Sequence, residues 1–192
     1  MERRAPEFGS PIEGPAVLLP SPHRDERGLF ARLSCPREFA ELGIAFSAAQ
    51  VSLSRNPARH TLRGMHYQPG EWAEGKIVRA TRGAAFDVAV DLRPDSPTYL
   101  SWCATRLSAD NLAAFFIPRG FAHGFLTLEP DTDIVYEIDR PFEPGHGAGL
   151  RWNDPALAID WPAEPAVIGE RDAGYASIAG HGGVKQPPPS KA

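Results

Sequence analysis

The sequence predicts an all-β fold, with a β-jelly roll as the preferred architecture and only a few short helices. Three observations lead to this prediction. Short apolar or alternating runs recur along the chain, 20 prolines and 18 glycines are spread between them, and helical signals are brief. Many short strands joined by turns are typical of sandwiches and barrels rather than of α/β folds. The jelly roll is preferred because its interior commonly holds a small-molecule site.

The predicted strands follow one another at short intervals. They cover residues 16–19, 62–69, 76–80, 85–91, 99–107, 115–117, 124–128 and 132–138. Residues 85–91 give the clearest signal, because apolar Phe86, Val88 and Val90 recur at every second position. The opposite face of that strand then carries Asp87 and Asp91.

One short helix is predicted at residues 36–43. Pro36 stands at its start and Gly43 at its end, which are the positions where helices favour these residues. Single helical turns are also possible at residues 108–111, 155–158 and 170–176.

The chain of 192 residues suits one domain with a sizeable core. We expect residues 1–15 to form a flexible N-terminal segment and residues 16–178 to form the jelly-roll domain. Gly, Pro and Lys dominate residues 179–192, so a disordered tail is expected there.

Charge and composition exclude several classes of protein. The net charge is −4 without a basic block, which argues against binding nucleic acid through its phosphates. No apolar run approaches the roughly 18 residues needed to cross a membrane, and the N-terminus lacks the apolar region of a signal peptide. The two cysteines, Cys35 and Cys103, form no metal-binding pattern and are expected to be reduced thiols of a cytoplasmic protein.

Two histidines attract attention, His66 in a predicted strand and His123 between small residues; His60 has the character of a loop residue. A jelly-roll metal site usually contains an H-x-H pair. Gln68 stands at the second position of that pair after His66, so the sequence favours no bound metal. A structural, hydrogen-bonded histidine remains an alternative at each position.

An acid–base site needs a base, a carboxylate that orients it, a cation for a developing oxyanion and a proton donor. His66, an aspartate, Lys76 and Tyr136 are candidates for these roles, and Arg63 is a candidate to bind phosphate or carboxylate. Spacing alone does not show that these groups converge. From the residues alone, the prediction is a β-sandwich with a polar, enzymatic pocket.

Five blocks then carry a resemblance to a known family. They are TLRGMHYQP, GKIVRATRGAAFDVAVDLRPDSPTY, LSADN, IPRGFAHGFLTL and RWNDPALAIDWP, in this order. Together they resemble the dTDP-4-dehydrorhamnose 3,5-epimerase family, from Asp25 to Asp172. The resemblance implies a cupin-type β-jelly roll, a homodimer, and an isomerase that needs no cofactor.

The resemblance also implies the reaction. Members of this family act on a nucleotide-linked 4-keto-6-deoxyhexose, with dTDP as the expected nucleotide, and invert C3 and/or C5 through an enolate. The alternatives are a monoepimerase acting on a different nucleotide sugar, and a non-catalytic or metal-binding cupin that binds sugar nucleotides.

By resemblance, His66 is the base, Asp172 orients it, Lys76 stabilises the enolate oxygen and Tyr136 is the acid on the opposite face. Asp87 is a competing partner for His66, because a buried strand aspartate must face a polar group.

The positions that match substrate-binding residues of the family are Arg27, Phe30, Gln50, Arg63, His123, Phe142 and Arg171. The sequence departs from the family pattern at Arg32, Ser52 and Gly147. If these side chains face the pocket, the pocket is more positive than is usual in the family.

Overall fold

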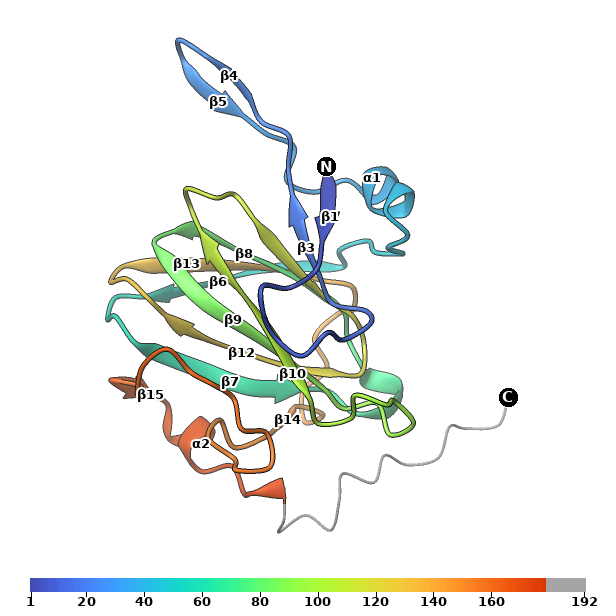
Figure 1. Cartoon of the computed structure of the whole chain (residues 1–192), viewed down its shortest axis with the longest axis vertical. Helices are drawn as coiled ribbons and strands as arrows, with labels where there is room; N and C mark the ends of the chain where they lie inside the picture. Colours follow the sequence, from blue (N-terminus) through green and yellow to red (C-terminus); the bar gives the residue numbers. More distant parts are fainter. Residues whose placement is uncertain (179–192) are drawn as a thin grey trace.

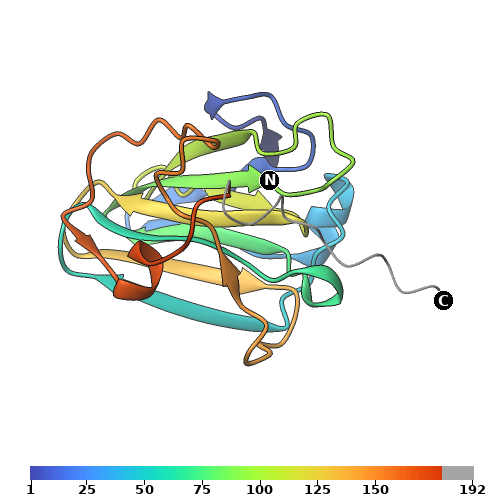
Figure 2. The same ribbon diagram turned by 90° about the horizontal axis from the view of Figure 1, so that it is seen from below.

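Two β-sheets pack face to face and form the body of the protein, as Figures 1 and 2 show for a computed structural model. The structure describes residues 1–178. The predicted tail at residues 179–192 lies outside the described residues.

The two sheets contain nearly all the strands. The six-stranded sheet has the order β1 (Glu2–Arg4), β3 (Ala16–Leu19), β11 (Ala114–Ile117), β8 (Lys76–Arg82), β13 (Thr132–Ile138) and β6 (Gln50–Asn56). The seven-stranded sheet has the order β14 (Ala148–Gly149), β7 (Thr61–Tyr67), β12 (Phe121–Thr127), β9 (Ala84–Asp91), β10 (Trp102–Ser108) and β2 (Phe8–Gly9), with β15 (Val167–Ile168) parallel to β7.

The remaining elements are short. A hairpin of β4 (His23–Asp25) and β5 (Gly28–Phe30) projects from the body in Figure 1. The helices are α1 (Pro36–Glu41), the 3-10 helix η1 (Gly70–Trp72) and α2 (Glu170–Ala173). The prediction of an all-β fold with a few short helices is therefore confirmed.

One apolar cluster fills the space between the sheets. Val78, Phe115 and Ile134 come from the six-stranded sheet, and Leu107 and Phe125 from the seven-stranded sheet. Phe115 and Phe125 are fully buried, and burying a side chain of this size stabilises a fold by roughly 1.5–3 kcal/mol.

The outer faces of both sheets are covered as well. Phe39 of α1 packs with Leu18 and Ile77 of the six-stranded sheet. Leu150 and Leu157, from the segment after β14, pack on the outer face of the seven-stranded sheet. Each sheet therefore has buried apolar side chains on both of its faces.

Strand β9 confirms the predicted alternation. Phe86, Val88 and Val90 belong to the outer cluster, whereas Ala85 and Ala89 belong to the inner one. By the same alternation, Asp87 points into the space between the sheets.

Some predicted boundaries were wrong. The strand expected at residues 99–107 starts only at Trp102, because the preceding loop is tied to Asp91 by Arg93, Ser96 and Thr98. The turn at residues 108–111 is not helical, since Ser108 and Asn111 hydrogen-bond to each other's backbone N–H. Residues 155–158 likewise form turns, whereas residues 170–173 are helical.

The sequence analysis also missed β6. This edge strand exposes Val51 and Leu53 and carries polar residues between them. This exposure explains its weak apolar signal. β6 is an edge strand of its sheet, and only one of its edges is paired, with β13.

The N-terminal segment is paired rather than loose. β1 pairs with β3, and β2 pairs with β10. Open sheet edges present unpaired backbone groups, and these short strands satisfy them. The sequence analysis expected a flexible segment at residues 1–15 and did not predict these paired strands. Among residues 1–178, no helix is long and apolar enough to cross a membrane.

Candidate active site

Two adjoining hollows between and beside the sheets share His66, Lys76 and Ile138. The inner pocket has a volume of about 270 Å³ and is lined by Ser52, Ser54, Arg63, His66, Lys76, His123, Tyr136 and Ile138. The outer pocket has a volume of about 520 Å³ and adds residues that include Gln50, Gln68, Glu74, Phe142, Gly147 and Arg171. Most of the side chains predicted for the site therefore converge.

His66 pairs with Asp172. The distance from His66 Nε2 to Asp172 Oδ1 is 2.7 Å, and the backbone N–H of Gly64 donates to Asp172 Oδ2 at 3.0 Å. β15 pairs with β7, which brings the following α2, and with it Asp172, against β7. The His66 side chain stays 37% exposed toward the pocket, so it can meet a ligand.

The environment of Asp172 favours its ionised form. Burial by itself raises the pKa of this carboxyl, but the hydrogen bonds from His66 and Gly64 outweigh burial and lower the pKa below its usual value. Asp172 is therefore an anion at neutral pH, and its hydrogen bond fixes the orientation of the His66 ring.

A second pair lies one strand away. The distance from His123 Nε2 to Asp87 Oδ1 is 2.9 Å, and both side chains are almost completely buried. Asp87, the competing candidate, therefore faces His123 and not His66. Burial raises the pKa of Asp87, although His123 opposes this shift. Among residues 1–178, Asp87 Oδ2 has no hydrogen-bond partner.

Tyr136 stands on the wall formed by the six-stranded sheet. Its ring lies 5.9 Å from the His123 ring in an edge-on arrangement. Burial, followed by the charge of Asp87, raises the pKa of the Tyr136 phenol far above its usual value. The phenol therefore keeps its proton at neutral pH and can act as a proton donor.

The close approach of β7 and β12 places the two histidines. His66 and His123 are register partners across these strands. A Cβ on Gly64 would lie 2.5 Å from Gly124 Cα, so the strands approach more closely than side chains at this point allow. The small residues beside His123 thus permit close contact between the two backbones.

The predicted substrate-binding residues divide into two groups. Arg63 lines the inner pocket, with its Nε donating to Asn56 Oδ1 at 2.8 Å, and His123 lines it too. Gln50, Phe142 and Arg171 line the outer pocket. The Phe142 N–H donates to Gln50 Oε1 at 2.9 Å, which ties the exposed phenyl ring to β6.

Arg27 and Phe30 are not part of this pocket. Both belong to the projecting β4–β5 hairpin, where Phe30 is 73% exposed and Arg27 bonds to Asp25. Arg32 also lies elsewhere and pairs with Glu38 of α1. Arg32 therefore adds no positive charge to this pocket, contrary to the expectation from the sequence.

Two residues that the sequence analysis did not consider, Glu74 and Tyr175, border the site. Glu74 forms an ion pair with Lys76, and Gln68 hydrogen-bonds to Glu74. The Tyr175 ring lies 6.2 Å from the His66 ring and fills the space that a Cβ on Gly149 would occupy. Glu74 could have been found from its spacing, because residues two apart in extended chain share a face.

Within the described residues, no group of three His, Cys, Asp or Glu side chains is arranged to hold a metal ion. His66 and His123 each bond to an aspartate instead. Their neighbourhood fits proton transfer, since a base, a cation and a protonated phenol line connected pockets.

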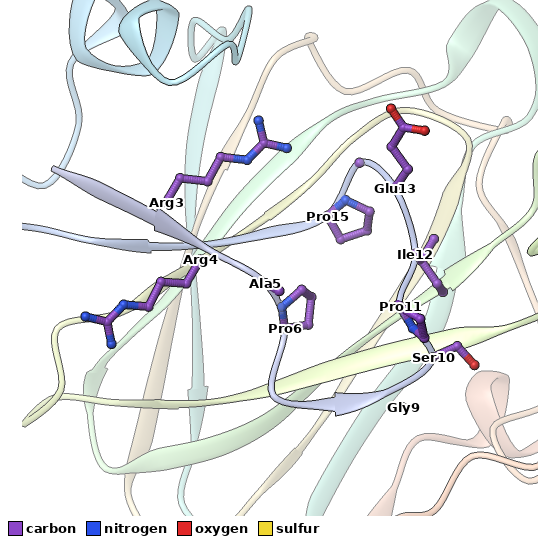
Figure 3. Close-up of a pocket in the computed structure, with 11 residues that line it drawn as sticks. Arg3, Arg4, Ala5, Pro6, Gly9, Ser10, Pro11, Ile12, Glu13 and Pro15 are labelled. Carbon is purple, nitrogen blue, oxygen red and sulfur yellow. The ribbon is translucent and has the colours of Figure 1, made fainter.

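A separate hollow of about 630 Å³ lies along the N-terminal loop, as Figure 3 shows. Pro6, Pro11 and Pro15 line it, and its arginines, Arg3 and Arg4, point to different sides. Arg4 pairs with Glu2, and Arg3 donates to the Leu42 carbonyl. This larger hollow brings no acid–base pair together.

Comparison with known proteins gives consistent matches. A family model described as dTDP-4-dehydrorhamnose 3,5-epimerase matches residues 9–179. A dTDP-4-dehydrorhamnose 3,5-epimerase from Pseudomonas aeruginosa is 45% identical over 162 residues, which is 82% of this chain and 88% of the relative.

Solved structures are similar over most of their length. A dTDP-6-deoxy-D-glucose-3,5-epimerase from Legionella pneumophila, in complex with dTDP-4-keto-L-rhamnose, has a TM-score of 0.83 and 36% identity, covering 90% of this chain and 92% of that one. A 3'-monoepimerase from Streptomyces bikiniensis, in complex with dTDP-quinovose, has a TM-score of 0.82 and 30% identity, covering 92% and 88%. These matches confirm the cupin-type β-jelly roll.

Proposed function

Because this chain belongs to the dTDP-4-dehydrorhamnose 3,5-epimerase family, we propose that it inverts C3 and C5 of a dTDP-linked 4-keto-6-deoxyhexose. Membership confirms the resemblance carried by the five sequence blocks, and with it an epimerase-like isomerase of deoxysugar biosynthesis. One observation carries the proposal: His66, which is bonded to Asp172, lines a single pocket with Lys76 and Tyr136, and Tyr136 stands on the opposite sheet.

The chemistry follows from the ketone at C4. Protons on C3 and C5 are acidic because the carbanion left behind delocalises into an enolate. Epimerisation needs a base that removes the proton from one face and an acid that returns a proton to the other face. It also needs a positive group near the oxygen on which charge develops.

His66 is the proposed base. Its Nε2 is bonded to Asp172, so Nδ1 is the ring nitrogen left to take a proton from carbon. The Asp172 carboxylate then stabilises the imidazolium that forms. The exposure of His66 to both pockets supports this role.

Lys76 is the proposed cation for the enolate oxygen, and Tyr136 the acid on the other face. Lys76 borders both pockets, which is where the sugar and the nucleotide would meet. Tyr136 keeps its proton until it is needed, because burial raises its pKa. His66 and Tyr136 belong to different sheets, so they would approach opposite faces of the sugar.

The substrate would lie across both pockets. We propose that Arg63 and His123 bind the sugar in the inner pocket. The ring of Phe142, whose backbone N–H is bonded to Gln50, would stack on the nucleobase. Arg171 would contact the diphosphate.

The distant hairpin supports the proposal of a homodimer. Arg27 and Phe30 are exposed on β4–β5, away from this chain's own pocket. In a dimer, the hairpin of one copy can reach the pocket of the other. Mixing an inactive Arg27→Ala variant with an inactive His66→Ala variant tests this: activity that returns on mixing supports shared sites, and none argues against them.

Deuterium exchange tests the function. The protein is incubated with dTDP-4-keto-6-deoxyglucose in deuterated water, and the sugar is analysed by NMR. Deuterium at both C3 and C5 is the expected result. Exchange at one carbon makes the protein a monoepimerase, a possibility that the similarity to the Streptomyces bikiniensis enzyme keeps open. Tight binding without exchange would instead indicate a non-catalytic cupin.

A further inference from the structure

The lysine of the site is unusual within this sequence. Three of the 20 basic residues are lysines and the other 17 are arginines. Within residues 1–178, Lys76 is the only lysine. An arginine keeps its charge in nearly any surroundings, whereas the charge and position of a buried lysine depend on its partners. The partner of Lys76 therefore bears directly on the reaction.

That partner is Glu74. The distance from Lys76 Nζ to Glu74 Oε1 is 2.9 Å, and the two side chains are only 11% and 10% exposed. Gln68 Nε2 donates to the other carboxylate oxygen, Glu74 Oε2, at 2.7 Å. Both oxygens of Glu74 are thus engaged, one of them with the lysine.

The backbone between the two residues is also held. The Gly75 N–H donates to Asp139 Oδ1 at 2.8 Å, and the Asp139 N–H donates to the Gly75 carbonyl at 3.1 Å. A Cβ on Gly75 would lie 3.0 Å from Asp139 Oδ2, so this contact leaves little room for a side chain. The geometry of the Glu74–Lys76 pair is therefore set by its backbone as well as by its charges.

The charged and titratable groups around Lys76 come from several strands. They are Glu74 two residues before β8, Arg63 and His66 of β7, Asp87 of β9, His123 of β12, Tyr136 of β13, and Arg171 of α2 in the outer pocket. Arg63, Arg171 and any protonated histidine disfavour a second positive charge, and Asp87 already bonds to His123. Glu74 is the carboxylate in direct contact with the lysine.

We propose that Glu74 is a positioning residue that holds the Lys76 ammonium charged and fixed at the junction of the two pockets. The inference rests on the proposed function, in which Lys76 meets the enolate oxygen. A cation that is already in place stabilises developing charge without reorganising during the reaction. Glu74 does not need to touch the substrate for this effect.

The test uses Glu74→Gln, which keeps the shape and the hydrogen-bonding oxygen but removes the charge. Glu71→Gln is the matched control, because Glu71 lies three residues away in η1 and is exposed. Without this carboxylate, the Lys76 ammonium loses the contact that holds it at the junction of the two pockets. The basic limb of the kcat/KM profile should move to lower pH, and kcat at neutral pH should fall about 10-fold.

The lysine is also measured without turnover. Reductive ¹³C-methylation labels Lys76, Lys185, Lys191 and the N-terminus, and a Lys76→Arg variant assigns the Lys76 signal in an NMR titration. The inference is overturned if this titration and the basic limb are the same in Glu74→Gln as in the original protein. It is also overturned if Glu71→Gln shifts them equally.

The two proposals fail in different ways. If the original protein exchanges no deuterium, the proposed function is wrong, but the titration still reports whether Glu74 keeps Lys76 charged. If Glu74→Gln does not fold, Glu74→Asp retains the charge at a shorter reach. That variant should keep Lys76 titrating as in the original protein while lowering kcat; an unchanged kcat argues against positioning.

Discussion

His66 and His123 stand on neighbouring strands and each bonds to an aspartate, yet the surroundings of the two pairs differ. The His66 side chain is 37% exposed to the pocket, whereas that of His123 is 5% exposed. The hydrogen bonds to Asp172 overcome burial and lower its pKa, whereas burial dominates at Asp87 and raises its pKa.

The difference shows that a histidine–aspartate pair has different properties in different surroundings. Asp172 receives two hydrogen bonds and stays ionised, so it can stabilise a proton that arrives on His66. Asp87 has one partner and no water-exposed surface, so a new charge beside it is costly. We therefore propose proton transfer for the exposed pair and orientation of a substrate contact for the buried pair.

The largest effect is expected for His66→Ala. Removing the base should lower deuterium exchange at both C3 and C5 by about 10²- to 10⁴-fold, since a general base commonly contributes this much. NMR of the exchanged sugar measures the loss. The control is His60→Asn, in the loop before β7, because asparagine tolerates the positive φ of that position. Full exchange by His66→Ala would remove this residue as the base.

Asp172→Asn should come next, with kcat reduced on the order of 10²-fold because the amide cannot stabilise an imidazolium. Stability should respond to pH as well. The folded pKa of Asp172 is lowered, so its stabilisation is present above the ordinary value of 3.8 and is lost as the pH falls through the lowered value. Urea unfolding across this acid range compares the variant with the original protein. An unchanged kcat would separate Asp172 from the reaction.

Tyr136→Phe should affect deuterium exchange and net inversion to different extents. Without the phenol, His66 still removes protons, so exchange with solvent should fall less than about 10-fold while net inversion falls by about 10²-fold. Both quantities come from one NMR experiment, which makes each the control for the other. Equal loss of exchange and inversion would place Tyr136 outside the role of acid.

Asp87→Asn should have the smallest effect on activity, with kcat reduced less than about 10-fold and stability changed by about 1–2 kcal/mol, because an asparagine oxygen can still accept from His123. The pH dependence should have the opposite sign to that of Asp172. A raised folded pKa means that the contribution of Asp87 is present at low pH and is lost as the pH rises. If unfolding of both aspartate variants shows the same sign, the contrast between the pairs is wrong.

Much of the fold was predictable because buried strands repeat every second residue. The strands at residues 16–19 and 132–138 have the predicted limits, and β9 differs by one residue. β6 and the N-terminal strands were missed, since their side chains are largely exposed and leave a weak apolar pattern. Their pairing depends on which sheet edges are open, a property of the assembled sheets.

For the candidate site, the family blocks named residues that the pockets then bring together, including His66, Lys76 and Tyr136. Glu74 and Tyr175 were not predicted, although both touch residues of the site. Arg27 and Phe30 were predicted and lie apart from it. Glu74 lies two residues before Lys76, so its spacing offered a signal. The contact of Tyr175 with His66 joins segments far apart in sequence, and no local pattern encodes it.

By itself, the sequence determined the all-β class, the alternating strand β9, and the ordered motifs that carry the family. These depend on short-range periodicity and on residue identity. Only the tertiary structure decided that Asp172, 106 positions from His66, is its partner, and that Asp87 faces His123. The reason is physical: the partner of a buried polar group depends on which strands lie side by side and which end of the sheet stays open to water.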